Sequence, residues 1–291
     1  MTTTLASNSN RLSNEQILKR ARGRIANRAA VPNIISTRWS SGHSAAILVG
    51  VALIGLEAYE TRKIGFVSSW LIAMITLGAL ILITGHGVVG LWRGALIDDR
   101  NKISLSRFQL VLWTIIILSS FIVAAVLNIT YRIPQPLSIN IPQQLWFLMG
   151  ISTTSLIGSS LIKSAKKNGD PDPQEAGDTL KALAASGNVG ATSKGKLIVN
   201  LSPDDATWGD LFKGEELGNG AHLDVGKVQM FFFTLILALA YCVCIASDFH
   251  GASAITAFPS LDQGMITLLG ISHAGYLANK GISHTKNDED N

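Results

Sequence analysis

Two histidines and three hydroxyl-bearing residues stand inside long apolar stretches, where polar side chains are least expected. His86 lies in "TGHGVVG", and Ser272 and His273 lie in "LLGISHAGYLANKG". An earlier stretch, "LMGISTTSLIGSS", carries Ser152 and Thr153 at the matching places. Ionisable groups within membrane spans are costly and mark functional positions. We expect these five side chains to line a pore or solute site; the structural alternative is that the hydroxyls bond to their own helix and each histidine makes one interhelical bond.

The motifs of common enzymes and metal sites are missing from the sequence. It has no H-E-x-x-H or G-x-S-x-G motif, and its two cysteines lie together in an apolar run. The stretch "GATSKGKL" resembles a phosphate-binding loop, but Leu197 stands where that loop needs Ser or Thr to hold magnesium. We therefore expect no enzyme, no bound metal and no cofactor.

The candidate residues must be positioned by membrane helices. Only 15% of the residues are charged and the mean hydropathy is +0.32, whereas soluble domains carry about 25% charged residues. A helix needs about 20 mostly apolar residues to cross a bilayer. An all-α polytopic membrane protein with six transmembrane helices is predicted, at 44–59, 66–92, 106–129, 145–163, 226–247 and 263–281. The first span is short and has Glu57 near its outer end, and the last is weakened by His273 and Asn279.

The distribution of lysine and arginine predicts the orientation. Six spans place both termini, the 93–105 loop and the 164–225 segment on one side. The opposite side holds Arg62, Lys63 and Arg132, only three of the 24 lysines and arginines. Because basic residues concentrate in cytoplasmic loops, we expect an inner or plasma membrane protein with both termini in the cytoplasm.

The last four spans read as a duplication. A shift of 120 residues aligns Gln109 with Gln229, Thr114 with Thr234, and "LMGIS" with "LLGIS". Matched polar residues at one fixed offset indicate a true repeat. Each copy is a helical hairpin that starts on the cytoplasmic side, so spans 3–6 are predicted to form a tandem parallel hairpin repeat.

Small residues recur every four positions in the second helix of each predicted copy. Such stripes let helix backbones approach closely in lipid, where packing replaces the hydrophobic effect. We expect this packing face to join the two hairpins or to join subunits of a homo-oligomer. Its predicted members are Gly150, Gly158, Gly270, Ala274 and Ala278, with Thr154 between the first two.

Two polar segments on the predicted cytoplasmic side complete the chain. Residues 13–30 read as a basic amphipathic helix suited to anionic lipids; a topogenic signal is the alternative, and nucleic acid is disfavoured because a span follows closely. Its basic residues are Lys19, Arg20, Arg22, Arg24 and Arg28. The segment 164–225 is expected to hold a helix at 176–186, a strand at 196–201 and a capped helix within 202–220. Its candidate partner-docking residues are Trp208, Phe212, Glu215 and Glu216.

These features predict a domain order and two functions from different classes. The predicted domains are a basic segment (1–43), a first transmembrane hairpin (44–97), repeat unit 1 (98–163), a linker or small domain (164–221), repeat unit 2 (222–283) and a polar tail (284–291). The first function is an oligomeric channel or passive pore for ions or small solutes. The alternative is a membrane-anchored scaffold, sensor or effector that acts through its cytoplasmic segments.

Overall fold

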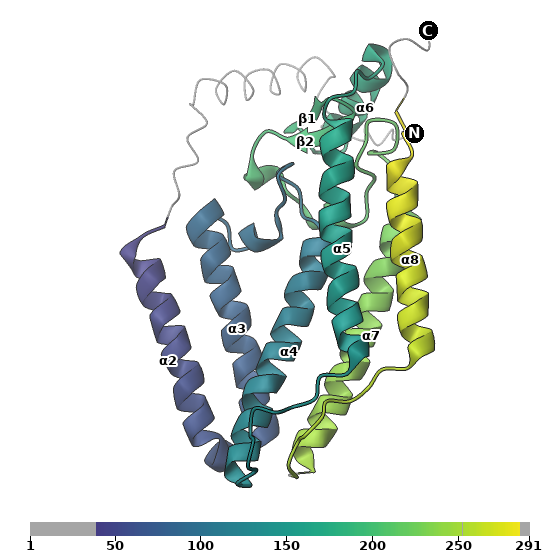
Figure 1. Cartoon of the computed structure of the whole chain (residues 1–291). Coiled ribbons are helices and arrows are strands. Elements are labelled where there is room, and N and C mark those ends of the chain that lie inside the picture. The colour runs from purple at the N-terminus through teal and green to yellow at the C-terminus, as the bar shows by residue number, and fades with distance from the viewer. Residues whose placement is uncertain (1–38, 252, 286–291) are drawn as a thin grey trace, which may run out of the picture.

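The computed structural model describes residues 39–251 and 253–285, which form a bundle of long helices with a small folded cap at one end (Figure 1). The predicted amphipathic helix with its five basic residues lies outside the described part of the chain. The long helices are α2 (Ser41–Ile64), α3 (Phe66–Val89), α4 (Leu105–Thr130), α5 (Gln143–Lys166), α7 (Val225–His250) and α8 (Gln263–Gly281).

Five of these helices, α2, α3, α4, α5 and α7, are long and apolar enough to cross a membrane, which indicates a multi-pass membrane protein. The sixth, α8, has 19 residues and is not among the five. Helix α2 is longer than the predicted first span of 44–59, because it begins at Ser41 and continues through the polar residues Glu60 to Lys63 to its end at Ile64. All six predicted spans are therefore helices, while the count of six membrane crossings stays a prediction.

Successive helices run in alternating directions, so their connections gather at two ends (Figure 1). At the end away from the cap, Gly65 alone joins α2 to α3, with a φ of +88° that favours glycine. The two longer connections at that end bond to one another. The amide of Asn140 donates to Thr256 at 2.8 Å, and Asn128 donates to the Ile255 carbonyl at 2.7 Å.

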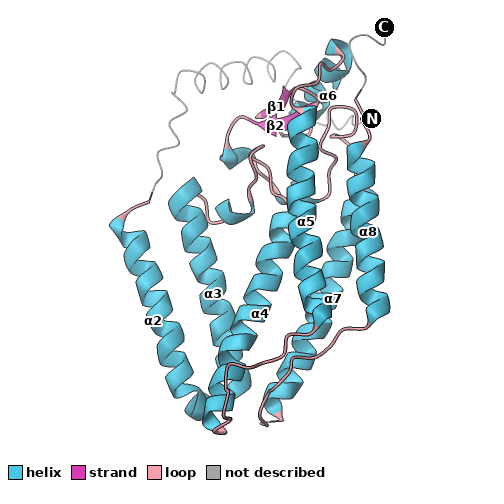
Figure 2. Ribbon diagram, viewed as in Figure 1, coloured by secondary structure: helices cyan, strands magenta, loops and turns pink. Residues whose placement is uncertain are grey.

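The cap, defined as residues 167–224, connects α5 to α7 and contains the only strands of the described residues (Figure 2). It comprises α6 (Pro173–Ala185), the antiparallel strands β1 (Ala191–Lys194) and β2 (Leu197–Asn200), and the 3₁₀ turns η2 (Pro203–Asp205) and η3 (Trp208–Leu211). A further 3₁₀ turn, η1 (Gly94–Leu96), lies between α3 and α4. The predicted helix within 202–220 is wrong: Ser202 caps η2, but the glycine-rich chain that follows does not continue as a helix.

Two hydrophobic clusters stabilise this arrangement. One fills the bundle between α3, α4, α5, α7 and α8, with Trp113, Tyr241 and Phe249 almost fully buried. The other lies where the cap meets the helices and includes Leu211 of η3 and Met230 of α7. The cap is therefore packed onto the helix ends and is not a free linker.

Candidate functional site

His86 belongs to an aromatic group at the cap end of α2 and α3. Its Nδ1 lies 3.0 Å from Nε2 of His43, and its ring stacks on that of Trp92 with centroids 4.5 Å apart. Helix α3 and helix α8 lie on different sides of the bundle (Figure 1). His86 is therefore not near the other predicted pore residues.

The other four predicted pore residues point in different directions. Ser152 is buried on the inner face of α5, whereas Thr153 is exposed and donates to a carbonyl of its own helix. His273 is buried, with its Nε2 3.3 Å from Oε1 of Gln109 on α4. Ser272 lines an open pocket. A single chain therefore does not assemble the five residues into one pore wall.

Gln109 links three helices through its amide. Its nitrogen donates to the Thr234 hydroxyl of α7 at 2.8 Å, its oxygen faces His273 of α8, and its side chain is 1% exposed. Gln229, which aligns with it in the predicted repeat, is exposed. The matched glutamines therefore occupy different environments: Gln109 is buried inside the bundle, and Gln229 is exposed on its surface.

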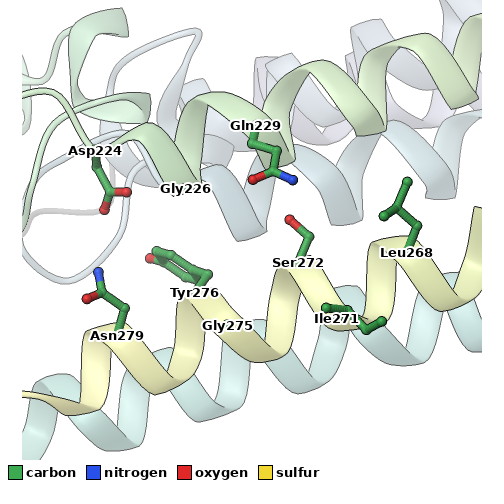
Figure 3. Close-up of a pocket in the computed structure, with 9 residues that line it drawn as sticks. All are labelled: Asp224, Gly226, Gln229, Leu268, Ile271, Ser272, Gly275, Tyr276 and Asn279. Atoms are coloured by element: carbon green, nitrogen blue, oxygen red, sulfur yellow. The ribbon is translucent and has the colours of Figure 1, made fainter.

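The pocket beside Ser272 lies between α7 and α8 and has a volume of about 370 Å³ (Figure 3). Gln229 and Ser272 point toward one another across it, and Asp224 and Asn279 lie at its cap end (Figure 3). Apolar residues of α8 line the opposite end. The pocket thus presents hydrogen-bonding groups near the cap and an apolar surface deeper along the helices.

The largest concentration of buried charge is an ionic cluster at the cap end, which sequence reasoning missed. Its members are Asp98, Arg100, Lys163, Glu215, Lys227 and Lys280. On one side, Arg100 donates two hydrogen bonds to Asp98, at 3.1 and 2.9 Å. Lys163, near the end of α5, donates to the same carboxylate at 2.6 Å. Asp98 therefore joins the α3–α4 connection to α5.

Glu215 is the centre of the other side of the ionic cluster. Its carboxylate lies 3.2 Å from Arg100 and 3.0 Å from Lys227 of α7, and it also pairs with Lys280 of α8. The hydroxyl of Tyr276 donates to it at 3.3 Å. One cap residue thus contacts the α3–α4 connection and the cap ends of two helices.

Two further ion pairs flank the cluster. Lys102 pairs with Asp210 of η3 at 3.0 Å, and both side chains are at most 5% exposed. Lys166, at the end of α5, pairs with Glu216, which also accepts from the His284 amide. These contacts bind the second half of the cap to the α3–α4 connection and to the end of α5.

The electrostatic environment of the ionic cluster favours the charged carboxylates. Burial by itself would raise the pKa of Asp98, but the charges of Arg100 and Lys163 outweigh it and lower that pKa. Burial likewise opposes ionisation of Glu215, whose pKa is held well below its ordinary value by Arg100, Lys227 and Lys280. Burial lowers the pKa of Lys102, against the opposing charge of Asp210. The cluster has four cations for two carboxylates, so each carboxylate is needed to balance several positive charges.

These contacts correct the predicted docking face. Glu215 and Glu216 do not form an exposed acidic face, because both carboxylates pair with basic residues of the same chain. Phe212 packs edge-on against Phe231 of α7, with ring centroids 5.1 Å apart. Trp208 alone of the four remains largely exposed, at 58%.

The small-residue stripes lie beside the buried helix faces. Gly150, Ala274 and Ala278 are exposed in the single chain, while Gly158 and Gly270 lie near side chains of the facing helix. Small residues do pack α5, but they are serines. The buried residues of α5 are Leu145, Leu148, Ser152, Ser155, Ser159 and Lys163. Use of the glycine stripe between subunits stays a prediction.

Within residues 39–251 and 253–285, no group of three or more His, Cys, Asp or Glu side chains is arranged to hold a metal ion. Comparison of the chain with known protein families, with curated proteins and with solved structures finds no match. The geometry of the ionic cluster shows buried ion pairs that connect the cap to the ends of the helices.

Proposed function

We propose that this protein is a membrane-anchored sensor or effector that acts through its cap. The observation that carries this proposal is the Glu215 carboxylate, which contacts basic residues of the α3–α4 connection, α7 and α8. A change in the cap, such as the docking of a partner at exposed Trp208, would have to alter these contacts and thereby act on the helix ends. Buried charge pairs suit such coupling because breaking them costs several kcal/mol.

The proposal includes six membrane crossings, with the cap and both termini in the cytoplasm. Helix α8 lies alongside α5 and α7 (Figure 1), and the distribution of lysine and arginine supports this orientation. The hairpins α4–α5 and α7–α8 both start at the cap end, which supports the parallel repeat. Anionic lipids are the proposed partners of the basic residues from Lys19 to Arg28, and no catalytic activity is proposed.

An oligomeric pore for ions or small solutes is the second candidate function. The pocket between α7 and α8 favours it, because Ser272 and Gln229 place polar groups on the outside of the bundle. Exposed polar side chains within a membrane-spanning helix are stabilised when another helix covers them. Such a pore would lie between several copies of the chain.

Flux and hydrogen exchange separate the two functions. The purified chain is placed in liposomes, and the passage of ions and small solutes is measured. The sensor or effector proposal predicts no flux, and predicts that Glu215→Gln speeds amide exchange at the cap ends of α7 and α8 as well as in the cap. Asp178→Asn, an exposed cap variant, serves as the control and leaves exchange unchanged. Flux that Ser272→Ala or His273→Ala reduces would instead establish the pore, and exchange confined to the cap would contradict coupling.

A further inference from the structure

Glu57 of α2 is a buried acid without a partner, at the opposite end of the bundle from the cap. Glu57 is only 7% exposed to solvent. In the part of the chain that the structure describes, neither carboxylate oxygen has a hydrogen-bond partner, and no basic group pairs with it. The hydroxyl of Ser69 on α3 lies close to the carboxylate, and it is likewise buried without a hydrogen-bond partner.

The position of Glu57 keeps its carboxyl away from bulk water. It lies seven residues before the end of α2 at Ile64, which corresponds to about 10 Å along a helix. The hydrocarbon core of a bilayer is about 30 Å thick. If α2 spans the membrane, the carboxyl is therefore inside the apolar layer, near Ser69 of α3.

The charged groups on the surrounding helices are directed elsewhere. On α2 itself, Arg62 donates to Thr130 at the end of α4, and Lys63 pairs with Glu60 at 2.7 Å. Helices α3 and α4, which pack against α2, carry one histidine and one arginine, His86 and Arg107. Both lie near the cap ends of their helices, many turns from Glu57. No charge on the packed elements is thus available to the carboxylate.

An unpaired carboxylate in apolar surroundings is very costly, and such a group is expected to be neutral. We propose that Glu57 is a proton-binding site within the membrane bundle, a carboxyl that holds its proton at neutral pH. This site is separate from the ionic cluster and from the proposed action of the cap. A protonated carboxyl can donate one hydrogen bond and accept others, so Ser69 offers the proton a natural partner.

An apolar carbodiimide tests the proposal because it reacts with protonated carboxyls in membranes. The carboxyl transfers its proton to one carbodiimide nitrogen and its oxygen adds to the central carbon, and the adduct rearranges to a stable N-acylurea. The whole reagent is added and nothing leaves, so the protein mass rises by one reagent molecule. The full chain in detergent micelles is treated with dicyclohexylcarbodiimide at neutral pH, and the modified peptide is identified by mass spectrometry.

Glu60 provides the matched control, since it lies one helical turn further along α2 and is paired with Lys63. We expect Glu57 to be modified and Glu60 not, with Glu57→Gln abolishing the label and Glu60→Gln leaving it intact. Equal labelling of both glutamates would overturn the proposal. Protection by sodium ions, but not by choline, would also overturn it, because a bound cation would then occupy the site.

Infrared spectroscopy settles the question if the reagent cannot reach the carboxyl. The spectrum of Glu57→Gln is subtracted from that of the unchanged chain at neutral pH. We expect the unchanged chain to show an additional carboxylic acid C=O band that shifts in D₂O. A pair of carboxylate bands in its place would show Glu57 to be charged, and the proposal would then be wrong.

Discussion

Buried acids have opposite environments at the two ends of the helical bundle. At the cap end, Asp98 and Glu215 are surrounded by four basic side chains, and every carboxylate has more than one cationic partner. At the other end, Glu57 is 7% exposed and has no partner among the described residues. The acids at the cap end keep their charge and connect segments of the chain. Glu57, at the other end, is stable only if its carboxyl is neutral.

This contrast follows from the segments that fold against each end of the bundle. The cap contributes Glu215 and folds over the helix ends, so the lysines of α5, α7 and α8 meet acids from outside their own helices. At the other end, the connections are bound to one another through their backbones and Asn128. They supply no base to Glu57. A folded segment therefore determines which buried charges are neutralised by pairing.

Loss of the Glu215 charge is the most damaging change predicted here. In Glu215→Gln, Arg100, Lys227 and Lys280 keep their charges but lose their shared anion, and removing one partner of a buried ion pair costs roughly 3–5 kcal/mol. We expect a lower midpoint of thermal unfolding in detergent and faster protease cleavage within the cap. Asp178→Asn, whose pair with Lys181 is exposed, is the control. A midpoint that matches the control would mean that the ionic cluster does not hold the cap.

Acid is predicted to produce a smaller and gradual loss of stability at the same site. The pKa values of Asp98 and Glu215 are lowered in the folded chain from ordinary values of 3.8 and 4.5. Their contribution is therefore complete at neutral pH, and it declines as pH falls below about 4.5, because the unfolded chain then takes up protons that the folded chain resists. Unfolding midpoints between about pH 6 and pH 3 measure this decline. The Glu215→Gln variant should show a flatter dependence, and identical slopes would contradict the assignment.

The helices were predictable from sequence because their signal is strong and local. Each predicted span is a helix, since long apolar stretches such as 106–129 have few alternatives in lipid. The cap was harder. Its strand at Leu197–Asn200 was predicted, but the segment after Ser202 was wrongly read as one helix, because its 3₁₀ turns depend on long-range contacts such as that between Asp210 and Lys102.

The ionic cluster could not be predicted, because most of its ion pairs join residues that are distant in the sequence, such as Lys163 and Asp98. Arg100 and Glu215 carry no shared motif, and Lys163 and Lys280 looked like ordinary boundary residues at helix ends. One signal was present: both lysines lie in the last turn of a mostly apolar helix. The predicted pore residues failed to meet for a related reason, since helical spacing gives the face of a residue but not the neighbour it contacts.

The smallest effect is predicted for Glu57→Gln, and it tests the contrast between the two ends directly. Glutamine has nearly the shape of a protonated glutamate and carries no charge. If Glu57 already holds a proton, the substitution removes no ion pair, and we expect the unfolding free energy to change by less than about 1 kcal/mol. The same chemical change at Glu215 is expected to cost several times more. The two variants are compared by thermal unfolding in the same detergent at neutral pH. Equal losses would mean that Glu57 is charged and paired, and that the two ends of the bundle follow the same rule.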